Sequence, residues 1–374
     1  MRRRRAALGA VAGAALLAGV MTGARGGGED AGRRPAPAAA PTAAGPRERA
    51  AVDETSLTRQ VGRLVVLRFA GTSAPRYVRE VLHEGRAAGA ILFRDNLTGP
   101  QQTRALTGEL RRGAASPPLI CVDQEGGDVR IVPWAGPERS APQQAAAGTV
   151  HADAEAAARD LRAEGINVSL APVADVASVP GAALAGRAFS TGFAAAAQAV
   201  GDAVRGWREG GVAPTVKHFP GLGGATVNTD DGPSTIGRSA AQLRDEDLVP
   251  FRAAVQAGVP LVMAGHARYP ALDPERIASQ SQPIIDGLLR RELGFRGVVI
   301  TDSTEAAAVQ AVTGVEEAAV RNVRAGVDVV LTTGRGSYIR VFRALLAEAR
   351  RDPAFRARVR QSAERVLALQ ARLG

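Results

Sequence analysis

The sequence is poor in cysteine and in aromatic residues: Cys121 is its only cysteine, and aromatic side chains make up 4% of its 374 residues. A single thiol excludes a disulfide framework within one chain. Because Cys121 lies in the apolar run 118–122, we expect it to be a small buried core residue. The scarcity of aromatic side chains argues against a surface on which the bases of single-stranded nucleic acid stack.

The formal net charge of +10 does not indicate a nucleic-acid partner, because part of it belongs to a predicted export signal. Residues 1–24 contain four arginines, an apolar stretch at 6–21 and small residues at 22–24, the pattern of a signal peptide. The apolar stretch is shorter than the span of about 20 residues that a transmembrane helix needs. Removing the four arginines leaves 43 of the 47 basic residues against 37 acidic ones. We therefore expect a secreted or cell-wall-associated protein without stable membrane insertion.

The rest of the chain divides into a predicted linker and one large domain. Residues 25–50 are rich in Gly, Pro and Ala without apolar periodicity, which is typical of a disordered linker. Within 51–374, short apolar runs alternate with helical patterns, and a last helix is expected at 353–373. The runs lie at 64–70, 90–93, 119–122, 166–172, 213–216, 261–264, 297–300 and 327–331.

Eight such runs over roughly 290 residues match the α/β class and the (β/α)8 barrel, as a single domain. A doubly wound open sheet is the alternative. No Gly-x-Gly-x-x-Gly turn follows the first run, which weakens that alternative.

Charged side chains follow several of the predicted strands. They include Asp123, Asp175, the pair Lys217-His218, His266 and Asp302. In a barrel these strand ends meet at one mouth, where such groups can hold a polyhydroxylated ligand. Strict alternation along a strand would send Lys217 and His218 to opposite faces. Both reach one ligand only if the strand is irregular there, which Pro220 and Gly221 favour.

Five motifs occur in one order along the predicted barrel. They are Asp-Gln-Glu-Gly-Gly at 123–127, Ala-Pro-Val-x-Asp at 171–175, Arg-Ala-Phe-Ser at 187–190, Lys-His-Phe-Pro-Gly at 217–221 and Gly-Phe-x-Gly-Val-Val-Ile-Thr-Asp-Ser at 294–303. Together they resemble glycoside hydrolase family 3, in its single-barrel β-N-acetylglucosaminidase branch, over roughly residues 55 to 350. The resemblance implies a retaining glycosidase that needs no metal or other cofactor.

The resemblance also assigns roles to individual residues. Asp302 takes the place of the nucleophile, and the residues that hold the terminal sugar correspond to Asp123, Arg187, Lys217 and His218. A helix cap is the structural alternative for Asp302, and ion-pair partners for the others. For Glu125 and Asp175 a structural role is expected at least as readily as a role in binding the sugar. His266 is expected to be a packed or hydrogen-bonded residue.

The sequence departs from the family pattern in the loop 222–234, which contains no histidine. The family carries Asp-Ser-His there, with the histidine thirteen positions after the motif lysine, whereas this chain has Asn-Thr-Asp at 228–230. Either Asp230, or less readily Asp231, serves as the acid/base, or the loop has lost proton transfer. A second departure places Asp128 and Ile131 where the family has two arginines, with Arg130 beside the second, so a shifted sugar preference is an alternative.

The leading hypothesis is an exported β-glycosidase of the N-acetylglucosaminidase type, which acts on cell-wall (peptidoglycan) fragments or chitin-type oligosaccharides. It is expected to be a monomer. Its catalytic residues would be Asp302 and Asp230. The first alternative is a catalytically impaired sugar-binding barrel. A second takes Gly-Arg-Gly-Ser at 334–337 as a phosphate-binding loop of an unrelated barrel enzyme.

Overall fold

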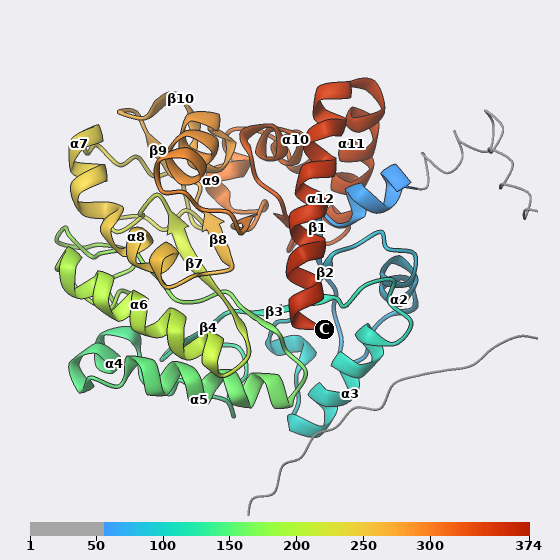
Figure 1. Ribbon diagram of the computed structural model, residues 1–374, viewed down its shortest axis with the longest axis horizontal. Coiled ribbons are helices and arrows are strands. Elements are labelled where there is room, and N and C mark those ends of the chain that lie inside the picture. Colours follow the sequence, from blue (N-terminus) through green and yellow to red (C-terminus); the bar gives the residue numbers. More distant parts are fainter. Residues whose placement is uncertain (1–55) are drawn as a thin grey trace, which may run out of the picture. The chain divides into compact units, whose positions relative to one another are not determined.

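The computed structural model describes residues 56–374, so the predicted signal peptide at 1–24 and linker at 25–50 lie outside the described residues. Eight parallel strands form one sheet that curls into a barrel (Figure 1). In spatial order they are β11 (Val298–Thr301), β8 (Leu261–Ala264), β7 (Ala213–Phe219), β6 (Val168–Ser169), β3 (Leu119–Val122), β2 (Gly89–Ile91), β1 (Val65–Arg68) and β12 (Val330–Leu331). A bridge from Ile300 to Val329 links the two ends of this order. The prediction of a (β/α)8 barrel is confirmed.

The strands are buried on both faces, which explains why they read as continuous apolar runs. In β3, Cys121 belongs to the cluster inside the barrel together with Leu119, whereas Ile120 and Val122 pack outward against the helices. The same alternation holds in β8 and β11. Cys121 is therefore a buried core residue, as its sequence context predicts.

The close pairing of β2 with β3 requires glycine at position 89. A Cβ atom on Gly89 would lie 1.9 Å from the carbonyl oxygen of Leu119, which is closer than any side chain allows. The short strand β2 thus begins at the point where its backbone can approach its neighbour.

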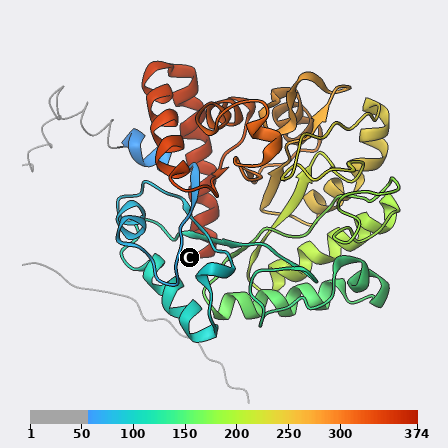
Figure 2. The ribbon, with the colours of Figure 1, turned by 180° about the vertical axis from the view of Figure 1, so that it is seen from behind.

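Helices surround the sheet (Figures 1 and 2). They are α2 (Arg76–His83), α3 (Pro100–Arg111), α4 (Ala141–Ala147), α5 (Val150–Ala163), α6 (Phe193–Glu209), α7 (Ala240–Gln242), α8 (Val249–Gln256), α9 (Ala307–Gln310), α10 (Val315–Ala325), α11 (Ser337–Arg351) and α12 (Pro353–Leu373), with π-helical segments at Leu243–Asp247 and Pro283–Glu292. Two hairpins, β4 (Gln124–Gly126) with β5 (Val129–Arg130) and β9 (Arg268–Tyr269) with β10 (Asp273–Ile277), extend the loops after β3 and β8.

Helix α12 covers the amino ends of the strands. Val366 and Leu369 join the cluster inside the barrel, and Gln370 donates to the carbonyl of Ala88, just before β2. Fully buried Asp328, just before β12, pairs with Arg358 and Arg365 of α12 and with Arg290. This end of the barrel is therefore closed, and the carboxyl ends of the strands form the open mouth. Within residues 56–374 no helix is both long and apolar enough to cross a membrane.

Candidate active site

Side chains from three strands meet at the mouth of the barrel. Asp123 directly follows β3, Lys217 and His218 lie near the end of β7, and Asp302 directly follows β11. Ion pairs join Lys217 to Asp123, and His218 lies beside Asp302. The structure thus brings together four residues that the sequence places at three strand ends.

Lys217 lies at the centre of a charged group beneath the mouth. Its Nζ atom is 2.6 Å from Oδ1 of Asp123 and 2.6 Å from Oε1 of Glu125. Only 2% of the lysine is exposed, and about a quarter of the Asp123 side chain. Asp123 is therefore the member of this pair that faces the opening, with Lys217 below it.

Glu125 also binds Arg187, which comes from the loop after β6. Its two carboxylate oxygens accept hydrogen bonds of 2.8 and 2.7 Å from Nε and Nη2 of the guanidinium. Burial raises the pKa of Glu125, but the charges of Lys217 and Arg187 outweigh it and lower that pKa to about 2. Arg187 keeps 24% of its side chain exposed, so an ionised, buried glutamate holds it at the rim of the site.

The backbone of β7 is irregular where it delivers Lys217 and His218. Its register against β8 shifts between Val216 and Phe219, and the Lys217–His218 peptide bond is cis. Val216 and Phe219 both pack outward, and the Phe219 ring lies edge-on to Phe251 of α8. The expected irregularity therefore exists at Lys217–His218, and a second cis bond follows at Phe219–Pro220.

The imidazole of His218 lies between two carboxylates. Its Nδ1 is 2.6 Å from Oδ2 of Asp175, and its Nε2 is 3.8 Å from Oδ2 of Asp302. Asp175 is fully buried and also accepts the backbone N–H groups of His218 and Leu222. Asp175 thus fixes both the ring and the backbone from which the following loop starts.

Asp302 is a largely buried carboxylate that remains ionised. Its Oδ1 accepts a 2.8 Å hydrogen bond from the N–H of Ser303, and 15% of its side chain is exposed. Burial acts to raise its pKa, but His218, His266, Lys217 and the Ser303 N–H together lower it. An ionised carboxylate open to the mouth can act as a nucleophile.

His266 supports this region as a buried hydrogen-bonding residue. Burial lowers its pKa despite the charge of Asp302. Nε2 lies 3.0 Å from the carbonyl oxygen of Ser303 and so donates to it, while Nδ1 accepts from Ser279 at 2.9 Å.

The loop after β7 brings Asp230 toward Asp302. The carbonyl oxygens of Thr229 and Asp230 accept the N–H groups of Ala308 and Ala307 at the start of α9, at 3.0 and 3.1 Å. These amides have no acceptor within their own helix, so the loop satisfies them. Since Ala307 is five residues after Asp302, the two carboxylates are held on one framework.

The surroundings of Asp230 favour its protonated form. Partial burial raises its pKa first, and the negative charge of Asp302 raises it further; His218, His266 and Arg187 oppose both effects. The residue as a whole is exposed, so its carboxyl group lies at the edge of the mouth and not beneath it.

The two positions after β3 at which the sequence differs from the family pattern lie in different parts of the β4–β5 segment. Asp128 is exposed in the turn between β4 and β5, and Ile131 donates its N–H to the carbonyl of Asp123. Arg130 accepts a hydrogen bond from Arg94 through its backbone carbonyl at 2.9 Å. Its side chain is half-buried on the same hairpin.

The segment 334–337 lies beside a carboxylate. Glu305 accepts the N–H and the hydroxyl of Thr333, at 2.8 and 3.0 Å, and a Cβ on Gly334 would meet Glu305 at 2.8 Å. A negative charge at this place opposes phosphate, so the phosphate-loop alternative has no support in the structure.

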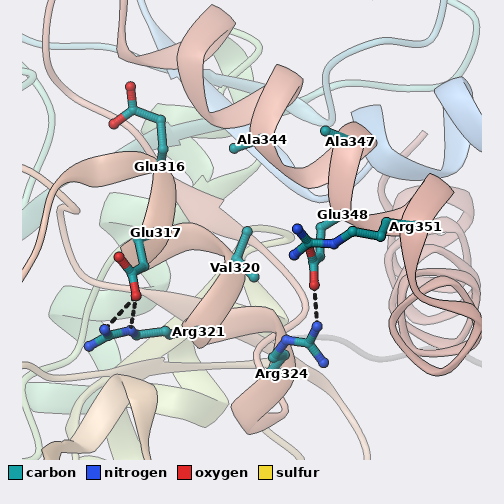
Figure 3. Close-up of a pocket in the computed structure, with 9 residues that line it drawn as sticks. All are labelled: Glu316, Glu317, Val320, Arg321, Arg324, Ala344, Ala347, Glu348 and Arg351. Carbon is teal, nitrogen blue, oxygen red and sulfur yellow. Dashed lines mark hydrogen bonds and ion pairs between the residues drawn. The ribbon is translucent and has the colours of Figure 1, made fainter.

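A surface pocket of about 570 Å³ lies between α10 and α11, away from these strand ends (Figure 3). Glu317 pairs there with Arg321, and Glu348 with Arg324 and Arg351. Apart from Glu316, which pairs with Arg340, its charges are paired with one another, and it contains none of the residues at the mouth.

Glu125 and Asp175, for which the sequence favoured a structural role at least as readily, orient Arg187, Lys217 and His218. The available signal was their position: each follows a barrel strand within a motif. Burial of a carboxylate beside a cation became visible only in three dimensions.

Comparison with known proteins points in the same direction as the geometry. The profile described as "Glycosyl hydrolase family 3 N terminal domain" matches residues 56–369. A β-hexosaminidase of Stenotrophomonas maltophilia is 37% identical over 279 residues, covering 72% of this chain and 82% of that protein. An uncharacterized secreted glycosyl hydrolase of Arthroderma benhamiae is 33% identical over 332 residues, covering 85% and 94%.

The fold is also that of a solved enzyme. A glycoside hydrolase family 3 β-N-acetylglucosaminidase from Paenibacillus sp. superposes with a TM-score of 0.80 at 36% identity. The superposition covers 85% of this chain and 62% of that chain, so the present chain spans less than two thirds of its length.

Proposed function

Because this chain belongs to glycosyl hydrolase family 3, and is thus a glycoside hydrolase, we propose that it is a retaining β-N-acetylglucosaminidase. Asp302 is the nucleophile and Asp230 the acid/base in this proposal. The observation that carries it is the opposite effect of the site on two neighbouring carboxyl groups. The pKa of Asp302 is lowered and that of Asp230 is raised, the division of labour that a nucleophile and a proton donor need.

The reaction then proceeds in two displacements. A carboxylate oxygen of Asp302 attacks the anomeric carbon, and the bond to the leaving oxygen breaks as Asp230 gives that oxygen its proton. The product of this step is a glycosyl ester of Asp302 and a free alcohol. Ionised Asp230 next takes a proton from water, whose oxygen attacks the same carbon and releases Asp302.

The terminal sugar is held by Asp123, Arg187, Lys217 and His218. Asp123 and Arg187 are partly exposed and charged, so they can form strong hydrogen bonds with sugar hydroxyl groups. Lys217 and His218 are almost fully buried and already paired, which fixes their geometry before a sugar binds.

The substrates proposed are chitin-type oligosaccharides or peptidoglycan fragments, met outside the cytoplasm. The export signal predicted at 1–24 and the secreted relative support that location. All six proposed site residues come from one chain, so a monomer suffices. The alternative of an impaired sugar-binding barrel has less support, because the altered loop still presents a carboxyl group beside Asp302.

The test compares two substrates that differ in their leaving group. Nitrophenol leaves without much help from an acid, whereas a sugar alcohol needs a proton. We expect Asp230→Asn to slow cleavage of a β-linked N-acetylglucosamine disaccharide by about 10²–10⁴-fold, and the first step on the nitrophenyl glycoside far less. Asp302→Asn should abolish both, and a fluorinated glycosyl inactivator should label the peptide that contains Asp302.

Asp231→Asn is the matched control, since Asp231 is the next acid in the same exposed loop. It should leave the ratio of the two rates unchanged. Equal losses on both substrates in Asp230→Asn would contradict the role of Asp230. Labelling of another residue would contradict that of Asp302.

A further inference from the structure

We propose that Asn228 positions Asp230 and determines which of the two carboxyl oxygens carries the catalytic proton. This inference rests on the proposed function of Asp230 as the acid/base. Asn228 acts through Asp230, so it is a positioning residue.

Two hydrogen bonds join the Asn228 side chain to Asp230, and they run in opposite directions. Nδ2–H of Asn228 donates to Oδ2 of Asp230, and the backbone N–H of Asp230 donates to Oδ1 of Asn228, both at 3.3 Å. A backbone N–H can only donate, so the amide oxygen must face it. The NH2 group is thereby left facing the carboxyl group.

The backbone of Asn228 closes the turn independently of its side chain. Its carbonyl oxygen accepts the N–H groups of Asp231 and Gly232 at 3.0 and 3.1 Å. The two carbonyls that follow are held by α9, as described above. Substitution of the side chain therefore leaves the main supports of the loop in place.

The direction of the Asn228 hydrogen bond decides where the proton of Asp230 resides. An amide NH2 group donates and cannot accept. A proton on Oδ2 would point at these hydrogens, so Oδ2 stays an acceptor and the proton occupies Oδ1. The proton is thus available on the oxygen that Asn228 does not hold.

The titratable groups that act on Asp230 come from four strands: Asp302 after β11, His218 in β7, His266 after β8 and Arg187 after β6. The Asp302 carboxylate already favours protonated Asp230. A carboxylate at position 228 would add to that effect. It would also compete for the proton, since two adjacent carboxyl groups share one between them.

The first test is Asn228→Asp, which separates positioning from turn formation. Aspartate keeps an acceptor for the Asp230 N–H but replaces the NH2 donor with a second carboxylate. We expect kcat/KM for the disaccharide to fall about 10- to 100-fold, with the alkaline limb of its pH profile at higher pH and Tm nearly unchanged. Wild-type rate and pH profile would overturn the inference.

The second test asks whether Asn228→Asp raises the activity of the Asp230→His variant. In Asp230→His, the imidazole needs an acceptor at position 228 for its second N–H. The NH2 group of Asn228 cannot serve, and its oxygen already faces the backbone. We expect Asn228→Asp to raise disaccharide activity at least about tenfold in the Asp230→His background, although it lowers activity in the wild type. A change of the same sign in both backgrounds would overturn the inference.

The two proposals can fail separately. If Asp230→Asn does not discriminate between leaving groups, the role of Asp230 fails and that of Asn228 with it. If it does discriminate but Asn228→Asp resembles the wild type, only the inference about Asn228 fails. The first test needs no histidine variant, so it decides even if Asp230→His does not fold, which thermal unfolding would reveal.

Discussion

Nδ1 of His218 lies 2.6 Å from Asp175, and Nε2 of the same ring lies 3.8 Å from Asp302. A buried carboxylate thus orients the imidazole that approaches the nucleophile. His218 is a main reason why the pKa of Asp302 is lowered against the effect of burial. The ionisation of Asp302 therefore depends on His218 and, through the orientation of its ring, on Asp175.

Removing that support should move the acid limb of the pH–rate profile. Asp302 must be ionised to attack, so a higher pKa of Asp302 shifts the acid limb of kcat/KM to higher pH. We expect this shift in His218→Ala, and a smaller one in Asp175→Asn, where the ring loses its charged partner. Asp153→Asn, on the distant helix α5, is the control. An unmoved acid limb in His218→Ala would contradict the interaction.

The alkaline limb should report Asp230. This residue must be protonated to give its proton to the leaving group, so kcat/KM falls as pH rises through its raised pKa. Asp230→Asn should remove the alkaline limb on nitrophenyl substrates and leave the acid limb in place. A profile that retains both limbs would assign the proton donor to another group.

Lys217 is the only lysine in the sequence, although lysine and arginine together number 47. Because the Lys217 side chain is 2% exposed and its ammonium group is bound to two carboxylates, we expect it to resist reductive methylation in the folded protein. Its raised pKa also disfavours the reactive neutral amine. Mass spectrometry should find modification of the Lys217 peptide only after denaturation. The amino-terminal amine is the internal control, and equal reaction rates at the two amines would refute the burial of Lys217.

Glu125 should make stability depend on pH. Its folded pKa is lowered from 4.5 to about 2, so its stabilising contribution is complete above pH 4.5 and is lost as pH falls toward 2. The full effect is on the order of 3 kcal/mol. Glu125→Gln lacks it, so the gap in unfolding free energy between wild type and variant should narrow as pH falls from 6 to 3.

Glu317→Gln is the control for that measurement. Glu317 pairs with Arg321 at the surface, where an ion pair contributes about 0–1 kcal/mol. The difference in unfolding free energy between the wild type and Glu317→Gln should be small at every pH. A constant gap for Glu125→Gln would mean that Glu125 titrates alike in the folded and unfolded states.

The link between the acid/base loop and α9 can be cut at one hydrogen bond. Ala307→Pro removes the N–H that donates to Asp230, and proline suits the first position of a helix. Ala306, with φ −54° and ψ 141°, already has the backbone that precedes proline. We expect about a tenfold or larger loss of kcat on the disaccharide with little change in Tm.

Arg76→Pro provides a matched control. Arg76 is the exposed first residue of α2, and within residues 56–374 its N–H has no acceptor in another loop. The activity of Arg76→Pro should equal that of the wild type. If Ala307→Pro were equally active, the contact with α9 would not position Asp230.

The sequence was sufficient to predict the barrel because its strands are buried on both faces. The bounds of β3, β8 and α12 were predicted residue for residue, since each begins and ends where the apolar pattern does. Strand β6 is shorter than the predicted run 166–172. After Ser169 the regular strand ends, although the carbonyls of Ala171 and Pro172 still accept the N–H groups of Thr215 and Lys217.

The positions of the charged residues were also predictable, but their partners were not. Strand ends identified Asp123, Lys217 and Asp302. The pairing of Glu125 with Arg187, 62 residues apart, depends on how the loop after β6 folds over the mouth. Periodicity carries no information about such loops, which explains why Asp230 remained one of two candidate acids.

The contact between Thr229–Asp230 and the first amides of α9 has a stereochemical consequence. The four residues between Asp302 and Ala307 act as a spacer between the attacking and the protonating group. Insertions in this spacer would move the pair apart. When the two carboxyl groups of a glycosidase are far enough apart to admit a water molecule between them, the enzyme hydrolyses the glycosidic bond with inversion at the anomeric centre. The length of this short segment therefore helps to decide the configuration in which the sugar is released.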